Sequence, residues 1–368
     1  MEQTIKLLEK LISFKSTADR PEEIKRGFEY IASLFDSGKF DVQMPEKNGK
    51  YSLLVSFKGR DGLRPRILLN GHFDVVPAEN EGQFEMKVEG NKAFGRGTLD
   101  MKGMVAVLIE VMRELGTLGS PQDIALLLNG DEEVGGENGA GYMVREVGMK
   151  PEFVICPDGR NPESFNLINK GKGVLWLELV ANGKSAHGAY PWEGENAIEK
   201  IMGAIQKIKV LIGDVEPNAW KTTVNLGVIE TSNKTPNAVP DYARAVLDIR
   251  FTETLAKTPK ELQEKIQNLI PEVQVNVLEE SALFFADETD PLLQQFKRVA
   301  EEVLGKSVPF TYSHGAADVR YFGEIGVPGV LFGATGENMH AEGEWVDLDS
   351  LEKNKEILLK FLASRPRV

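Results

Sequence analysis

Hydrophobic and polar positions follow two recurring patterns along the chain. Short apolar runs bounded by polar residues predict buried parallel strands, because such strands are covered on both faces of a sheet. These runs are residues 66–70, 124–129 and 153–156. Apolar side chains at helical spacing lie around them and predict helices over residues 3–14, 22–35 and 102–115. The alternation of strand and helix predicts an α/β fold with a mainly parallel sheet flanked by helices.

The pattern changes near Lys170. From there to about residue 280 the expected order is strand, helix, strand, strand, helix, strand, which is typical of a small ferredoxin-like α+β sandwich. From residue 281 the first pattern resumes. The sequence therefore predicts a discontinuous first domain, residues 1–169 and 281–368, with a second domain, residues 170–280, inserted into it.

The composition narrows the class of protein. Of the 368 residues, 42% are hydrophobic and 27% are charged, as in globular proteins with a sizeable core. The net charge of −13 argues against nucleic acid or an anionic membrane as the main partner. The single cysteine, Cys156, excludes an intrachain disulfide, and we find neither a secretory signal nor an apolar run of about 18 residues. We therefore expect a cytoplasmic protein without a membrane span.

Histidine and acidic residues follow several of the predicted strands. In His72-Phe73-Asp74 the two polar side chains point to the same face of an extended backbone. A carboxylate in that position takes the second ring N–H of a metal-binding imidazole and fixes its orientation. The alternative is a capped strand end with solvated acids. Because open α/β sheets bind ligands at the carboxyl ends of their strands, the pattern favours a site here.

Residues at the strand ends and in the adjoining loops form a candidate metal-binding set. Its members are His72, Asp100, Glu132, Glu133, Asp158 and His340. Imidazoles and carboxylates without thiolates suit Zn²⁺, Mn²⁺ or Co²⁺. With Glu132 left out, three acidic ligands and two histidines fit two metal ions that share one carboxylate, and we assign Asp100 to that bridge. His72 and Asp158 would complete one metal site. Glu133 and His340 would complete the other.

Glu132 is left over beside the proposed metals. A carboxylate there can take a proton from metal-bound water and pass it to a leaving amine. The alternative for residues 131–133 is a solvated acidic turn, and Asp158 also suits a turn between Pro157 and Gly159. The triplet directly follows a predicted buried strand and precedes glycines, which favours the catalytic interpretation.

Five motifs follow one another along the chain, at residues 71–77 (GHFDVVP), 95–103 (GRGTLDMKG), 130–135 (GDEEVG), 183–191 (GKSAHGAYP) and 339–341 (MHA). With these motifs in this order, the chain resembles the co-catalytic metallohydrolases that include aminoacylase, acetylornithine deacetylase, succinyl-diaminopimelate desuccinylase, glutamate carboxypeptidase and several dipeptidases. The resemblance implies a zinc-exopeptidase-like first domain and the ligand and base assignments given above. It also implies two bound ions, first of all Zn²⁺, with Asp74 as the partner of His72 and a cis peptide between Asp100 and Met101.

The resemblance further implies roles for the inserted domain. The domain matches the family's lid, which often forms a homodimer interface. His187 matches a lid histidine that reaches the partner subunit's site and stabilises the oxyanion. Asn237 matches an asparagine that contacts substrate, and Arg250 matches an arginine that binds the substrate carboxylate. The alternative for Arg250 is an ion pair at the end of a strand.

Two positions divide the family or depart from it. Asp158 stands where the desuccinylase, the deacetylase and aminoacylase usually have Glu, whereas several dipeptidases and tripeptidases have Asp. Residues 314–320, HGAADVR, lie where many members have Gly-Thr-Ser-Asp-Ala-Arg. The hydroxyl pair that helps to hold the substrate carboxylate is therefore absent, and His314 is the candidate donor in its place.

We expect a two-metal amide hydrolase that releases an amino acid from a small-molecule N-acyl amino acid or a short peptide. Metal-bound hydroxide would attack the carbonyl while Glu132 transfers the proton. A metal-dependent dipeptidase is the alternative with the same chemistry. A non-catalytic binding or dimerisation protein is opposed by the complete ligand set and Glu132. A two-metal phosphoesterase is opposed by the lack of a basic phosphate cradle.

Overall fold

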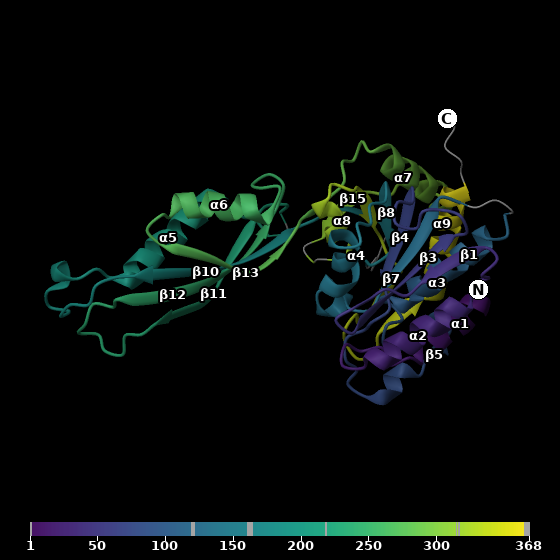
Figure 1. The fold of residues 1–368 in the computed structure, drawn as a ribbon, viewed down its shortest axis with the longest axis horizontal. Helices are drawn as coiled ribbons and strands as arrows, with labels where there is room; N and C mark the ends of the chain where they lie inside the picture. Colours follow the sequence, from purple (N-terminus) through teal and green to yellow (C-terminus); the bar gives the residue numbers. More distant parts are fainter. Residues whose placement is uncertain are drawn as a thin grey trace. The chain divides into compact units, whose positions relative to one another are not determined.

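The computed structural model describes residues 2–118, 122–159, 165–217, 219–313, 315 and 317–363. The chain divides into two compact units (Figure 1). Unit 1 comprises Met1–Asn169, Phe285–Tyr312 and Ala317–Val368, and unit 2 comprises Lys170–Phe284 and Ser313–Ala316. The main segment of unit 2 begins at the residue predicted for the inserted domain and ends four residues later than predicted.

The main sheet is formed by short strands from both ends of the chain. They are β1 (Phe40–Gln43), β2 (Glu46–Lys47), β3 (Lys50–Phe57), β4 (Ile67–His72), β7 (Ile124–Asn129), β8 (Phe153–Cys156), β9 (Leu167–Gly171), β14 (Phe284–Phe285), β15 (Phe310–Ser313) and β16 (Gly329–Leu331). The order along the sheet is β1-β3-β7-β4-β8-β16-β9-β14, with β2 on β3 and β15 on β9. The central strands β7, β4, β8 and β16 are parallel, and antiparallel strands flank them. The predicted α/β fold is thus confirmed.

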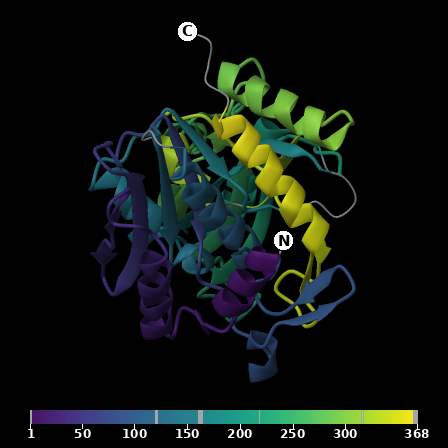
Figure 2. The same ribbon diagram turned by 90° about the vertical axis from the view of Figure 1, so that its right-hand side faces the viewer.

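Helices cover this sheet. They are α1 (Glu2–Ile12), α2 (Pro21–Ser33), α3 (Lys102–Leu115), α4 (Tyr142–Arg145), α7 (Pro291–Leu304), α8 (Val319–Glu324) and α9 (Leu348–Ala363). α1, α3, α9 and α7 pack side by side in a row (Figure 2). α3 is buried along nearly its whole length and contacts β4 and β7, and apolar side chains occupy every position from Met104 to Ile109. No helix in the described ranges combines the length and the apolar character that a membrane crossing needs.

A small sheet in unit 1 escaped prediction. It consists of β5 (Lys87–Glu89), β6 (Lys92–Phe94), β17 (Gly336–Glu337) and β18 (Trp345–Asp347) in the order β17-β18-β6-β5. Strands of two or three residues carry no recognisable periodicity. β6 pairs with β18, so the chain segment before Asp100 and the segment after His340 are joined here.

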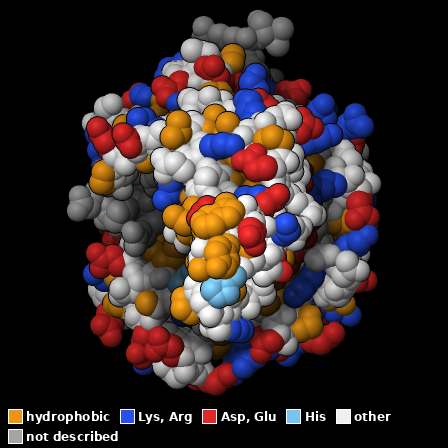
Figure 3. All heavy atoms as spheres, turned by 90° about the vertical axis from the view of Figure 1, so that its left-hand side faces the viewer, with side chains coloured by type: hydrophobic (Ala, Val, Ile, Leu, Met, Phe, Trp, Pro, Cys, Tyr) orange, Lys and Arg blue, Asp and Glu red, His pale blue; other side chains and the backbone are white. Residues whose placement is uncertain are grey.

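Unit 2 is the predicted ferredoxin-like sandwich. Its elements are β10 (Gly173–Asn182), α5 (Ala197–Ile212), β11 (Thr223–Thr231), β12 (Tyr242–Phe251), α6 (Pro259–Leu269) and β13 (Gln274–Ser281), and the antiparallel sheet has the order β11-β12-β10-β13. Every second residue of β12 is buried in a core shared with both helices, as a half-covered sheet requires. Figure 3 shows hydrophobic side chains gathered beside a histidine on one exposed face.

Candidate metal centre and active site

The candidate ligands gather at the carboxyl ends of the central parallel strands. His72 is the last residue of β4, the pair Glu132-Glu133 opens a 3₁₀ turn after β7, and Asp158 follows β8 by two residues. Asp100 lies between β6 and α3, and His340 lies between β17 and β18. The structure therefore places all the predicted metal ligands in unit 1. They lie at or near the carboxyl ends of its strands, which is where open α/β sheets bind ligands.

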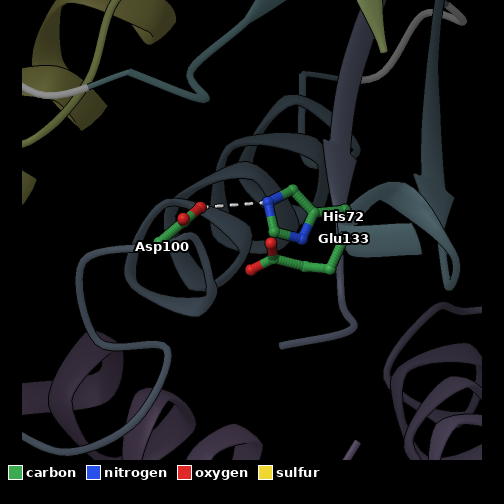
Figure 4. Close-up of side chains that lie close together, drawn as sticks. All are labelled: His72, Asp100 and Glu133. Atoms are coloured by element: carbon green, nitrogen blue, oxygen red, sulfur yellow. Dashed lines mark hydrogen bonds and ion pairs between the residues drawn. The ribbon is translucent and has the colours of Figure 1, made fainter. Parts of the chain in front are cut away.

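The carboxylate of Asp100 stands between the two histidines. Its Oδ1 lies 3.1 Å from His72 Nε2, and its Oδ2 lies 2.9 Å from His340 Nε2. Asp158 Oδ1 lies 3.7 Å from the same nitrogen of His72, and Glu133 Oε1 lies 3.3 Å from the same nitrogen of His340. The polar ends of His72, Asp100 and Glu133 face one another (Figure 4). The ligands thus form two groups that share Asp100.

The carboxylates of the site are buried or half-buried, and this burial opposes their ionisation. It raises the pKa of Glu133 to about 7, raises the pKa of Glu132 well above its ordinary value, and raises the pKa of Asp158. Asp100 differs. Burial alone would raise its pKa, but hydrogen bonds with His340 and His72 hold the pKa below its ordinary value.

The donor set fits divalent cations. His72 and His340 stand against the carboxylates of Asp74, Asp100, Glu132, Glu133 and Asp158, and all of these side chains are buried or half-buried except that of His340, which is 49% exposed. Glu133 Oε1 is buried and, apart from its 3.3 Å approach to His340 Nε2, has no hydrogen-bond partner in the part of the chain that the structure describes. Because buried carboxylates are costly without counter-charges, bound cations would compensate them, and imidazole with carboxylate suits Zn²⁺ and related ions.

Asp74 supports the site in a way that spacing alone did not predict. His72 Nδ1 lies 3.0 Å from the main-chain oxygen of Asp74 and 3.6 Å from its carboxylate oxygen Oδ1. The carboxylate accepts hydrogen bonds from Glu132 N at 3.2 Å and from Glu133 N at 3.0 Å. One residue therefore orients the imidazole through its main chain and fixes the acidic turn through its side chain.

The loop of Asp100 continues directly into α3. The peptide between Asp100 and Met101 is cis, as the resemblance implied. Met101 Sδ accepts a hydrogen bond from His72 N at 3.2 Å. Lys102 is fully buried, its Nζ donates to the main-chain oxygen of Phe14 at 2.7 Å, and burial lowers its pKa to about 7.

Sequence reasoning missed Lys102 and Glu344 as parts of the site. Lys102 had a usable signal, because it lies inside the motif GRGTLDMKG. Glu344 had none, because an acid next to Trp345 in a glycine-rich loop looks like a surface residue. In the structure Glu344 is 2% exposed and accepts hydrogen bonds from the loop that ends at Asp100.

The predicted substrate-binding residues that the structure describes belong to unit 2. In this unit the predicted oxyanion donor His187 lies beside Asn237. Gly188 N donates to the main-chain oxygen of Asn237 at 2.7 Å, and His187 forms a β-bridge with Ala238. The ring of His187 is exposed, and its Nδ1 accepts from Ala189 N at 3.0 Å.

Arg250 lies apart from that pair in the sequence and carries an ion pair. Its Nε and Nη2 donate to the two carboxylate oxygens of Asp248 at 2.8 and 3.1 Å. A strand-end ion pair was the alternative to carboxylate binding, and both uses are compatible with a half-buried guanidinium. His314 lies outside the described residues.

Comparisons with known proteins agree with this geometry. The family model of Peptidase family M20/M25/M40 matches residues 68–364. A succinyl-diaminopimelate desuccinylase of Rickettsia felis is 28% identical over 382 residues, which cover 97% of this chain and 98% of the relative. The same enzyme of Wolinella succinogenes is 28% identical over 373 residues, with 97% and 98% covered.

Solved structures show the same fold. The aminopeptidase PepT of Bacillus cereus superposes with a TM-score of 0.73 at 21% identity and covers 98% of this chain and 97% of its own. The family match spans most of the sequence and includes every candidate metal ligand. The chain therefore belongs to Peptidase family M20/M25/M40 and is a metal-dependent hydrolase of amide bonds.

Proposed function

We propose that this hydrolase uses two metal ions. The observation that carries the proposal is that the two carboxylate oxygens of Asp100 face different histidines, each accompanied by another carboxylate. His72 and Asp158 would hold one ion, His340 and Glu133 the other, and Asp100 both. Zn²⁺ is the expected ion, and Co²⁺ and Mn²⁺ suit the same donors. When bound, such ions polarise the substrate carbonyl and activate water for attack.

Glu132 is the proposed general base and acid. Its carboxylate groups with His72 and Asp158, with one ligand atom of each within 4.8 Å of the others. A carboxylate whose pKa is raised by burial can take a proton from the attacking water and give it to the leaving amine. The hydrogen bond from Glu132 N to Asp74 fixes the turn from which the side chain projects.

The proposed substrate is an N-acyl amino acid or a short peptide, and it carries a free carboxylate. Support comes from unit 2, where Arg250 lines a cavity of about 570 Å³. Lys172 and Lys209 line the same cavity, together with the apolar side chains of Ile212 and Val224, and the acidic residues Asp214 and Glu216 also line it. Basic groups beside apolar walls suit a carboxylate on an aliphatic body.

Two substrate classes compete. The desuccinylase relatives make N-succinyl-diaminopimelate the first candidate, and the deacylase assignment follows them. Asp158 favours the dipeptidase alternative, because the resemblance associates Asp at this position with dipeptidases and tripeptidases. The same centre would serve both, since each reaction breaks a C–N amide bond.

A substrate panel tests this proposal. The protein loaded with Zn²⁺, Co²⁺ or Mn²⁺ is given N-acetyl amino acids, N-succinyl-diaminopimelate and unblocked di- and tripeptides, and release of the amino acid is measured. Cleavage confined to blocked amino acids supports the deacylase. Cleavage of free peptides alone supports the peptidase. A metal-loaded protein that cleaves none of them would contradict the proposed substrate class.

We also propose a homodimer formed through unit 2, as the resemblance implies. β11 is an edge strand that pairs with β12 alone among the described strands. It exposes the apolar side chains of Leu226, Val228 and Ile229. An exposed edge strand with apolar side chains is a template for pairing with a second chain.

The loop of His187 supports the same proposal. Tyr190 is 51% exposed and Trp192 is 75% exposed. Their ring centroids lie 5.7 Å apart, and the centroid of His187 lies 5.8 Å from that of Tyr190. Exposed aromatic side chains are typical anchors of protein interfaces. His187 would thereby reach the partner subunit's site and donate a hydrogen bond to the oxyanion.

Mixing two inactive variants tests the role of His187 across the dimer. Glu132→Ala and His187→Ala are each expected to be inactive alone. Subunit exchange between them creates one site with Glu132 from one protomer and His187 from its partner. We expect the mixture to recover about a quarter of wild-type activity, from random pairing in a two-fold dimer. No recovery after demonstrated exchange would contradict the trans arrangement.

A further inference from the structure

The buried carboxylate of Glu344 accepts four hydrogen bonds from a single loop. Its Oε2 accepts from Arg96 Nη1 at 2.7 Å and from Gly97 N at 3.0 Å. Its Oε1 accepts from Leu99 N at 2.9 Å and from Asp100 N at 3.1 Å. The side chains of Glu344 and Arg96 are each 1% exposed. Both oxygens of this anion are thus occupied by donors from the segment that ends at the proposed bridging ligand.

Glu344 itself belongs to the loop that carries His340. It lies four residues after that histidine and directly before β18. The neighbouring residue Trp345 pairs with Phe94 of β6, and Gly95 N donates to the main-chain oxygen of Glu344 at 3.0 Å. The pairing of β6 with β18 therefore continues into both loops. One side chain joins two ligand-bearing segments that are 240 residues apart in the sequence.

We propose that Glu344 is a positioning residue that sets the metal affinity of the site by fixing Asp100 relative to His340. The inference rests on the proposed two-metal centre. Three main-chain N–H groups and a guanidinium restrain the backbone at Asp100, so that its two oxygens stay directed at different histidines. Hydrogen-bonding partners of metal ligands are typically worth about 10–100-fold in metal affinity.

Glu344→Gln is the direct test. Glutamine keeps the shape of the side chain but replaces one acceptor oxygen with an NH₂ group, which would face N–H donors of the loop. Metal-free protein is titrated with Co²⁺, whose visible absorption reports both occupancy and ligand geometry. We expect the dissociation constants for both ions to rise about 10–100-fold, because Asp100 would bind both, and the absorption band to change. A folded variant with the wild-type constants and spectrum would overturn the proposal.

Glu110→Gln is a matched control. Glu110 is 5% exposed and accepts hydrogen bonds from Thr4 Oγ1 at 2.7 Å and from Lys355 Nζ at 3.0 Å. It is therefore also a buried, ion-paired carboxylate, but its partners lie on α1 and α9. We expect this variant to unfold at a lower temperature and to keep the wild-type Co²⁺ constants and spectrum. Equal loss of Co²⁺ affinity in both variants would mean that general destabilisation explains the effect, and would overturn the role of Glu344.

A double variant addresses the charge that Glu344→Gln leaves behind. Arg96 loses its buried counter-ion in the single variant, which is strongly destabilising. Arg96→Met with Glu344→Gln removes the unpaired charge. We expect it to fold and to bind Co²⁺ as weakly as the single variant, whereas wild-type affinity would overturn the proposal. A wild-type protein that takes up no metal would instead contradict the two-metal centre on which this inference rests.

Discussion

At Glu132, burial gives a carboxylate the proton affinity that its proposed role needs. Glutamine keeps its volume and polarity but cannot accept the proton of the attacking water. We expect Glu132→Gln to lower kcat by about 10²–10⁴-fold, the usual contribution of a general acid–base residue. Metal content measured by atomic emission should stay near two ions per chain.

Glu133→Gln is the matched comparison for that variant, because Glu133 is the neighbouring carboxylate and is proposed as a ligand. It should lose metal as well as activity. If Glu132→Gln loses metal and Glu133→Gln keeps it, the two roles must be exchanged. Both residues lie on one 3₁₀ turn, and both variants remove one carboxylate. A difference in metal content between the two variants therefore reflects the position of the carboxylate and not its charge.

Burial also makes the metal-free site sensitive to pH. It raises the pKa of Glu133 from 4.5 to about 7. For His72, burial acts to lower the pKa, but hydrogen bonds to Asp100 and Asp158 outweigh it and the pKa lies well above 6.5. A group with a raised folded-state pKa stabilises the fold below its unfolded pKa, and this contribution is lost as pH rises through the folded value. We expect the Tm of metal-free protein to fall between pH 5 and pH 8. The lowered pKa of Asp100 changes the stability of the fold only below pH 3.8, which is outside this range.

Metal binding should reverse that trend, because the ions bind the deprotonated ligands. The rise in Tm on adding Zn²⁺ to chelator-treated protein should be several degrees larger at pH 8 than at pH 5. Calorimetric scans with and without Zn²⁺ at the two pH values measure it. Equal rises at both would contradict the assignment of Glu133 and His72 as metal ligands.

Most of the site could be predicted residue by residue, because its members follow recognisable strands. His72 ends one of these strands, Glu132 and Asp158 follow two others within three residues, and the sheet brings such ends together. The main-chain contact of Asp74 with His72 and the hydrogen bonds of Glu344 could not be predicted. Both depend on loop conformation, which apolar periodicity does not encode.

Among the elements, predictability followed length and burial. β7, β8 and α3 have the bounds predicted from their apolar runs, since polar residues end each run sharply. β6 and β18 are too short for any pattern, and their pairing joins segments from opposite ends of the sequence. The sequence thus indicated which strands end at the site but gave no sign of the small sheet that holds two of its loops together.

The start of α3 gives a prediction at this scale. A Cβ on Gly103 would lie 2.3 Å from the main-chain oxygen of Thr98 and 3.4 Å from Leu351 Cδ2. Because a main-chain atom cannot rotate away, Gly103→Ala should force α3 and the loop of Asp100 apart. We expect it to lower the free energy of unfolding by about 1–3 kcal/mol, the usual cost of overpacking. Denaturant unfolding of the metal-free protein measures it.

Gly203→Ala in α5 is the control for that substitution. Nothing lies within 4 Å of a Cβ built on Gly203. Alanine there should raise the free energy of unfolding by about 0.5–1 kcal/mol, because glycine is a poor helix former. If Gly103→Ala proves as stable as the wild type, the close contact of α3 with the main chain at Thr98 does not hold the loop of Asp100 in place.

For the whole molecule, the two units carry different parts of the proposed function. Unit 1 holds every candidate metal ligand and Glu132, whereas unit 2 holds His187, Asn237 and Arg250. Each unit has its own sheet, and unit 2 has a core of its own. The change of pattern at Lys170 made the inserted unit predictable. The proposed pairing of unit 2 with a second chain rests on the exposed edge strand and on the resemblance.

Ile229→Lys tests the proposed pairing of unit 2 with a second chain. Ile229 is 52% exposed on β11, and a lysine on an edge strand opposes pairing with another chain. We expect light scattering to show a monomer where the wild type is a dimer. Metal content should stay unchanged, because the candidate ligands all belong to unit 1. Activity should fall by about 10²–10³-fold, because the monomer lacks the partner's His187 as an oxyanion donor.

Val88→Lys is the control for Ile229→Lys, because Val88 is 46% exposed on β5 of unit 1. It adds the same charge at a similarly exposed strand position and should leave both the dimer and the activity intact. A monomeric Ile229→Lys protein with full activity would show that each protomer completes its own site. His187 would then have to act within its own chain or have no part in catalysis, and the dimer, if it forms, would serve stability alone.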